Sequence, residues 1–175
     1  REGYRERVAT MWAATQELVS AIEQLPEVEL LTRPDANLFA FKTTNGDLFE
    51  LSDRLTECGW HVQPTYAYGR SPAHIHLTLD PGNAARVQDF LKDLKQCLVD
   101  LPEPTDPPAQ VVQMLEAAAS GGAGDLDPGM LMQQLGIADG QLPGRSAMIH
   151  RLLNAASPKT REALLVMFIG ELFSC

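Results

Sequence analysis

The chain has 175 residues, of which 45% are hydrophobic, which is enough for one sizeable core or for a compact domain with a helical appendage. Its 14 Lys and Arg stand against 23 Asp and Glu, giving a net charge of -9. A surface this acidic repels phosphate backbones and anionic lipid, so nucleic acid and membrane are excluded as default partners.

The three cysteines, Cys58, Cys97 and Cys175, show neither a disulfide framework nor metal-ligand spacing. We therefore expect reduced thiols in a cytoplasmic protein. The chain shows no signal-peptide pattern, and we expect it to be a piece of something longer. Its most apolar run, residues 163–169, is shorter than the roughly 20 residues that span a bilayer, so we expect no membrane segment.

The first half of the chain alternates between helical and strand patterns. Apolar residues recur at helical spacing over residues 8–25, which predicts a long amphipathic helix ending before Pro26. Strands are predicted at residues 28–31 and 38–42, and a turn follows at 43–46.

The central stretch from Asp47 to Leu79 predicts a helix followed by a β-hairpin. Asn45 or Asp47 can cap this helix, Gly59 stops it, and β-forming runs follow at residues 60–68 and 73–79. Cys58 continues the apolar spacing of the helix, so we interpret it as a small core residue. Trp12 and Trp60 are interpreted as core aromatics.

After a break at residues 80–83, Asn83 is a candidate N-cap for a helix reaching to about residue 101. The resulting element order is helix, strand, strand, helix, strand, strand, helix. This order predicts an α+β fold with a small, mostly antiparallel sheet and helices on one face, covering residues 1–103.

Residues 104–175 are predicted to form a Pro-rich linker and a helical tail. Four prolines between residues 101 and 108 favour an extended chain. The short helices expected beyond it lie at 111–119, 127–135 and 146–155, and after Ser157-Pro158. Residues 121–124 are interpreted as a flexible glycine linker. Because short apolar helices are marginal alone, the tail packs back on this domain or docks on a partner subunit.

Polar side chains gather around the turn of the predicted hairpin. Tyr66, Arg70 and His74 are candidate substrate-contacting residues if the turn reaches an active-site mouth, and the alternative is an ordinary polar turn. His61 and His76 add imidazoles nearby, but no Cys, Asp or Glu falls at a regular ligand spacing. We therefore expect no metal site.

Several segments in one order resemble the C-terminal domain of the group II pyridoxal-phosphate-dependent decarboxylase family, closest to its sphingosine-1-phosphate lyase branch. They are GY at 3–4, LFAF at 38–41, DLFELSDRL at 47–55, GWHV at 59–62, HIHLTL at 74–79 and FLKDL at 90–94. The resemblance covers roughly residues 1–103 and implies the small domain of a fold-type I pyridoxal-phosphate enzyme.

In such enzymes pyridoxal 5'-phosphate is bound by a lysine that follows a histidine, in a large domain that precedes this one. None of the four lysines of this chain follows a histidine. The resemblance therefore implies no catalytic and no cofactor-binding residue here, and a fragment that is inactive alone. It also implies the preceding large catalytic domain as a partner, a homodimer and a small-molecule substrate.

Glutamate decarboxylases of this family place arginines where this chain has Asp80-Pro81-Gly82. An aspartate repels a substrate carboxylate that a guanidinium would clamp. The resemblance thus implies a parent lyase of sphingolipid metabolism, cleaving a phosphorylated sphingoid-type amino alcohol to an aldehyde and phosphoethanolamine. The alternatives are an amino-acid decarboxylase and a free-standing α+β binding or regulatory module. A domain detached from an enzyme of this family should expose an apolar patch where the large domain packs, whereas a free-standing module should not.

Overall fold

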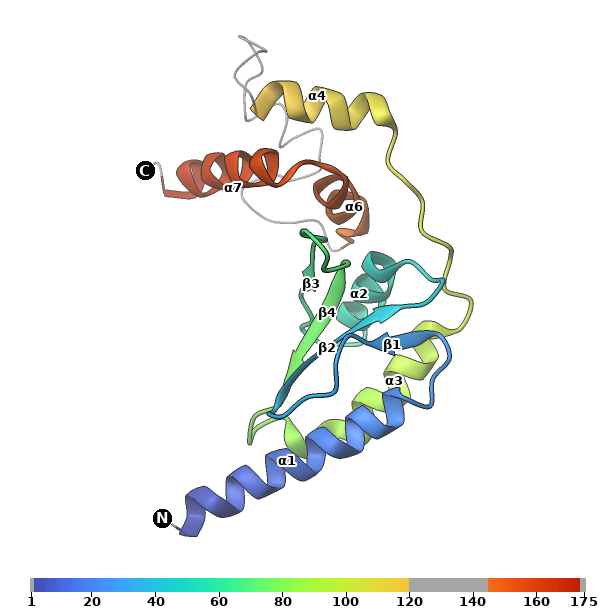
Figure 1. The fold of residues 1–175 in the computed structure, drawn as a ribbon, viewed down its shortest axis with the longest axis vertical. Coiled ribbons are helices and arrows are strands. Elements are labelled where there is room, and N and C mark those ends of the chain that lie inside the picture. The colour runs from blue at the N-terminus through green and yellow to red at the C-terminus, as the bar shows by residue number, and fades with distance from the viewer. Residues whose placement is uncertain (1, 120–144, 174–175) are drawn as a thin grey trace. The chain divides into compact units, whose positions relative to one another are not determined.

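The computed structural model describes residues 2–119 and 145–173, with the backbone alone at 165 and 167–173. It divides into two compact units, Arg1–Pro104 and Thr105–Cys175 (Figure 1). Each unit is considered by itself below.

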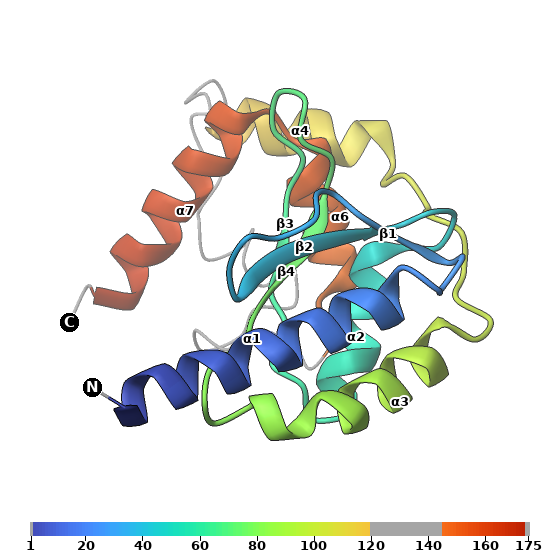
Figure 2. The same ribbon diagram turned by 60° about the horizontal axis from the view of Figure 1, so that its bottom comes forward.

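The first unit is built on a four-stranded antiparallel sheet in the order β1-β2-β4-β3. Its strands are β1 (Val28–Leu30), β2 (Leu38–Thr43), β3 (Pro64–Thr65) and β4 (His74–Thr78). Its helices are α1 (Glu2–Ile22), α2 (Leu48–Glu57) and α3 (Val87–Leu98), with a short 3-10 turn, η1 (Ala84–Arg86), before α3. The predicted α+β fold is therefore confirmed, and Figure 2 shows α1 and α3 side by side.

One face of the sheet carries the core. Phe39 and Phe41 of β2 lie opposite Leu77 and Ile75 of β4, and directly opposed residues share a face. These apolar side chains pack with buried residues of all three helices, among them Leu18, Val19, Ile22, Leu51, Leu55, Leu94 and Leu98. The opposite face carries polar side chains, including an ion pair of 3.0 Å between Lys42 and Glu29. The alternation of the strands thus places the helices on one face.

Helix α1 is confirmed, but only its second half is buried. Burial begins at Ala14 and continues through Ile22. Before that point Tyr4, Val8 and Trp12 are 75, 39 and 40% exposed, so the interpretation of Trp12 as a core residue is wrong. The three side chains are four residues apart and form one exposed line, which we call the α1 stripe.

Helix α2 begins at a buried cap. The Asp47 carboxylate accepts hydrogen bonds of 2.9 Å from the backbone N–H groups of Phe49 and Glu50, which confirms one of the two predicted caps. Gly59, with φ of +84°, follows the end of the helix as predicted. The helix ends at Glu57, and Cys58 beyond it is exposed rather than in the core, because the apolar face closes at Leu55.

The second unit contains α4 (Ala109–Ala119), α6 (Ala147–Ala155) and α7 (Pro158–Phe173), with α4 against both others. These match three of the predicted tail helices. Ser157 caps α7: its hydroxyl accepts from the Thr160 N–H at 3.3 Å, and its own N–H donates to Glu116 at 3.0 Å. The helix predicted at 127–135 and the glycine linker at 121–124 lie outside the described residues. Within the described ranges no helix is long and apolar enough to cross a bilayer.

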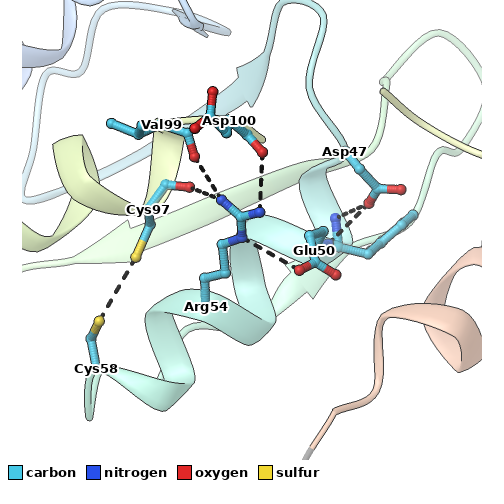
Figure 3. Close-up of polar contacts among 8 residues, drawn as sticks. Asp47, Glu50, Arg54, Cys58, Cys97, Val99 and Asp100 are labelled. Atoms are coloured by element: carbon cyan, nitrogen blue, oxygen red, sulfur yellow. Dashed lines mark hydrogen bonds and ion pairs between the residues drawn. The ribbon is translucent and has the colours of Figure 1, made fainter. Parts of the chain in front are cut away.

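Arg54 of α2 binds the backbone at the end of α3 (Figure 3). Its Nη1 donates to the carbonyls of Cys97 and Val99 at 3.0 and 2.9 Å, and its Nη2 donates to that of Asp100 at 3.2 Å. Its Nε lies 3.4 Å from Glu50 Oε1. Carbonyls at the end of a helix lack intrahelical donors and carry partial negative charge. One guanidinium thus binds the carbonyl of Cys97 in the last turn, that of the cap residue Val99 and that of Asp100 just beyond.

We predict that Arg54→Met lowers the free energy of unfolding by about 2–4 kcal/mol, because the carbonyls lose a charged donor. The free energy of unfolding of Arg54→Lys should lie between those of the unsubstituted chain and of Arg54→Met, since an ammonium keeps the charge but lacks the planar fork of donors. Urea unfolding followed by circular dichroism measures the change. Arg33 is the matched control because its side chain is 65% exposed and 3.9 Å from Glu23. Equal stability of Arg54→Met and Arg33→Met would contradict the role of Arg54.

Candidate functional site

The hairpin between β3 and β4 ends in a tight two-residue loop. Tyr68 and Ser71 exchange two backbone hydrogen bonds of 2.9 Å across it, leaving Gly69 and Arg70 at the tip. Gly69 has φ of +58° and Arg70 does not have a positive φ, as a type II′ turn requires. The hairpin is confirmed, although β3 spans only Pro64–Thr65 instead of the predicted 60–68.

The three predicted substrate residues lie on this hairpin but face different surroundings. The Tyr66 ring is half-buried, 6.2 Å from the ring of Phe49 in α2. His74 lies opposite Thr65 on the other face of the sheet, and its Nδ1 is 2.9 Å from the Pro72 carbonyl. Arg70 is exposed at the tip. The structure therefore does not gather Tyr66, Arg70 and His74 into one pocket, and their role stays a prediction.

A cleft of about 460 Å³ opens beside β4. Residues 60–63 would continue the β3–β4 pairing, but they are not paired with β4, and the space between the two segments is the cleft. Its apolar walls include Trp60, Val62, Leu77 and Phe90, and its polar side chains include Arg86 and His76. No carboxylate side chain lines it, in a chain that is acidic overall.

Trp60 organises the wall of this cleft. The Arg86 guanidinium lies 4.3 Å from its ring centroid, in cation–π geometry. Phe90 meets the ring edge-on at 5.1 Å, and the indole Nε1 donates to Asp93 at 2.8 Å. Trp60 is half-buried rather than a pure core residue. The sequence could not indicate this cleft, because its lining combines residues from separate segments, from Leu18 to Phe90, that only the folded chain brings together.

The turn at Asp80 differs in detail from the sequence prediction. Asp80 accepts hydrogen bonds from the N–H groups of Gly82 and Asn83 at 2.6 and 3.0 Å. Asn83 is the cap residue of η1 but makes no side-chain capping bond; its Nδ2 donates instead to the Thr78 carbonyl at 3.0 Å. The Asp80 carboxylate is thus engaged in forming its own turn.

The lysines of the described residues lie on a sheet face and on helix surfaces. Lys42 is ion-paired with Glu29 on the face of the sheet opposite the core. The other three lysines are exposed on helices: Lys92, Lys95 and Lys159. No lysine lines the cleft. Nor do the described residues contain a group of three or more His, Cys, Asp or Glu able to hold a metal ion.

Comparison with known proteins connects both sequence and fold to pyridoxal-dependent enzymes. Residues 109–171 match the family model described as pyridoxal-dependent enzyme, C-terminal putative HTH domain. Sphingosine-1-phosphate lyases of Arabidopsis thaliana and Oryza sativa are each 27% identical, over 97 and 93 residues. These alignments cover 55 and 53% of this chain. The resemblance to the C-terminal part of pyridoxal-dependent enzymes is confirmed.

Two solved structures share the fold. The sphingosine-1-phosphate lyase of Burkholderia pseudomallei has a TM-score of 0.52 at 19% identity, over 73% of this chain and 27% of that one. A Lactobacillus brevis glutamate decarboxylase has a TM-score of 0.51 at 23% identity, over 60% of this chain and 26% of its own. The chain spans only 17 and 16% of the length of the two plant lyases.

We predict that Trp60→Phe lowers the free energy of unfolding by about 1–2 kcal/mol, since it removes the hydrogen bond to Asp93. Trp12→Phe is the matched control, because the exposed Trp12 should change stability by no more than about 0.5 kcal/mol. Urea denaturation of both variants gives the comparison. A larger loss for Trp12→Phe would contradict the stabilising role of the hydrogen bond between Trp60 and Asp93.

Proposed function

We propose that this chain is the C-terminal part of a pyridoxal-phosphate-dependent carbon–carbon lyase. The parent would cleave a phosphorylated sphingoid-type amino alcohol to an aldehyde and phosphoethanolamine. The supporting observation is the match of residues 109–171 to a C-terminal model of pyridoxal-dependent enzymes, together with relatives named sphingosine-1-phosphate lyase. When bound, the cofactor would supply the electron sink for bond cleavage, from the preceding domain.

The proposed role of the first unit is structural: it completes one side of the active-site cleft of the parent. The α1 stripe supports this role, because it exposes Tyr4, Val8 and Trp12 on one line of a helix. An exposed half of a helix is marginal in water by itself, so a covering surface would stabilise it. The large catalytic domain is the proposed cover, and the stripe favours this interpretation over a free-standing module.

The proposed assembly is a cytoplasmic homodimer with no nucleic-acid partner. Although the matched model carries the words putative HTH, residues 105–175 contain seven Asp and Glu against four Lys and Arg. A surface with this balance is repelled by a phosphate backbone. The cysteine pattern supports the reducing compartment.

An amino-acid decarboxylase is the second candidate function for the parent. The fold shared with a glutamate decarboxylase favours it. Against an acidic substrate stands the sequence Asp80-Pro81-Gly82, which offers no guanidinium where a substrate carboxylate would bind. Phosphoethanolamine release, as opposed to carbon dioxide release, distinguishes the two reactions.

We predict an absorbance band at about 400–430 nm in the purified parent, due to lysine-bound cofactor, and its loss after borohydride. The 175-residue chain alone should show no such band, since no lysine follows a histidine in it. The measurement is a pair of spectra for each protein. A parent without the band would contradict the proposed enzyme and favour a binding module.

We predict that Arg70→Ala in the parent lowers kcat/KM by about 10–100-fold, if the hairpin tip binds the substrate phosphate through a charge-assisted hydrogen bond. Arg70 is exposed, so the fold should be retained. Steady-state kinetics gives the ratio, and Arg33→Ala is the control because Arg33 is exposed outside the hairpin. An unchanged kcat/KM for Arg70→Ala would remove the hairpin tip from the site.

A further inference from the structure

Two cysteines that are 39 positions apart in the sequence lie side by side in the first unit. The Sγ atoms of Cys58 and Cys97 are 3.8 Å apart (Figure 3). Cys58 follows the last residue of α2 and is exposed, whereas Cys97 lies in the last turn of α3 and is buried. Staggered side-chain rotamers can bring thiols at this distance into bonding range.

Arg54 fixes the backbone on both sides of this pair. Its carbonyl accepts the N–H of Cys58 at 3.1 Å, and its guanidinium donates to the carbonyl of Cys97 at 3.0 Å. Both contacts belong to well-formed helix ends, so the two sulfurs are held near each other by secondary structure. A chance approach of two flexible side chains would lack this support.

We propose that Cys58 and Cys97 form an oxidation site, in which a peroxide oxidises the exposed Cys58 and Cys97 then closes an intramolecular disulfide. The site joins the end of α2 to the end of α3. It is independent of the proposed lyase activity, because it depends only on contacts within the first unit.

The chemistry requires one peroxide for each disulfide formed. The Cys58 thiol loses its proton, and its sulfur attacks one oxygen of hydrogen peroxide, which breaks the O–O bond. This yields a sulfenic acid and one water. The Cys97 sulfur, on losing its proton, attacks the Cys58 sulfur and displaces hydroxide, which leaves as a second water. The two sulfurs together lose two electrons, and the peroxide gains them.

The surroundings assign different roles to the two thiols. Burial raises the pKa of Cys97 to about 12, and a hydrogen bond with Cys58 adds to the rise. Charge effects also act on it: those of Cys58 and Asp93 raise the pKa of Cys97, and that of Arg54 lowers it. At neutral pH Cys97 is therefore protonated and inaccessible, so the peroxide meets Cys58 first.

The test uses the full chain with Cys175→Ser, so that only the pair remains. After treatment with hydrogen peroxide, non-reducing peptide mapping should find one intramolecular disulfide between Cys58 and Cys97, reversed by dithiothreitol. With Cys97→Ala added, Cys58 should accumulate as a dimedone-reactive sulfenic acid. With Cys58→Ala instead, Cys97 should resist the same treatment. Circular dichroism checks that each variant is folded, and Cys97→Ser replaces Cys97→Ala if it is not.

Non-reducing peptide mapping of the Cys175→Ser chain, which keeps both Cys58 and Cys97, tests the proposal even if the alanine variants do not fold. Finding only disulfides between chains, or a Cys58 sulfenic acid that never closes, would overturn it. Labelling of Cys97 by dimedone at the same rate as that of Cys58 would also overturn the proposal.

The closure step also has an expected pH dependence. Its rate, followed after rapid formation of the sulfenic acid, should rise with pH between about 7 and 9, because burial raises the pKa of Cys97 and the thiolate fraction grows as the pH approaches that pKa. A rate that stays constant over this range would overturn the assignment of Cys97 as the closing thiol.

Discussion

A single guanidinium, that of Arg54, holds the two helices on which most of the first unit's features depend. It sits on α2 and supplies donors to carbonyls of Cys97, Val99 and Asp100, where α3 ends. Hydrogen bonds of this kind are both charge-assisted and directional, so they fix the separation and the register of the two helices. In that arrangement the two thiols lie close together, and Leu55 of α2 and Leu94 of α3 pack in one core.

The cleft beside β4 has a different origin, in a sheet that stops pairing early. β3 contains a proline, which has no N–H to donate, and pairing ends there. The residues before it diverge, and Trp60 turns to the side, where Arg86 and Phe90 flank its ring. The sheet therefore loses backbone hydrogen bonds but gains a cavity wall of aromatic and cationic groups.

Much of the fold could be predicted from the sequence, because helical spacing and strand alternation are local. The cap at Asp47 and the stop at Gly59 are local signals of the same kind. Trp12 and Cys58 show the limit of this reasoning: both continue an apolar period, yet both lie beyond the edge of the core. Periodicity shows which face of a helix is apolar, but not how far the rest of the protein extends along it.

The site was less predictable than the fold for a related reason. Tyr66 and His74 are close in sequence, but strand alternation puts them on opposite faces. Asp80 acts within its own turn, so its charge says less about a substrate than the sequence suggests. The cleft combines residues from four separate segments, a grouping that only the folded backbone produces.

The α1 stripe has a practical consequence for work on the isolated chain. An apolar line left in water is a place where two copies can adhere, since each shields the other. Light scattering or gel filtration of the isolated chain would then report self-association through the exposed α1 stripe. The quaternary state of the parent has to be measured on the parent.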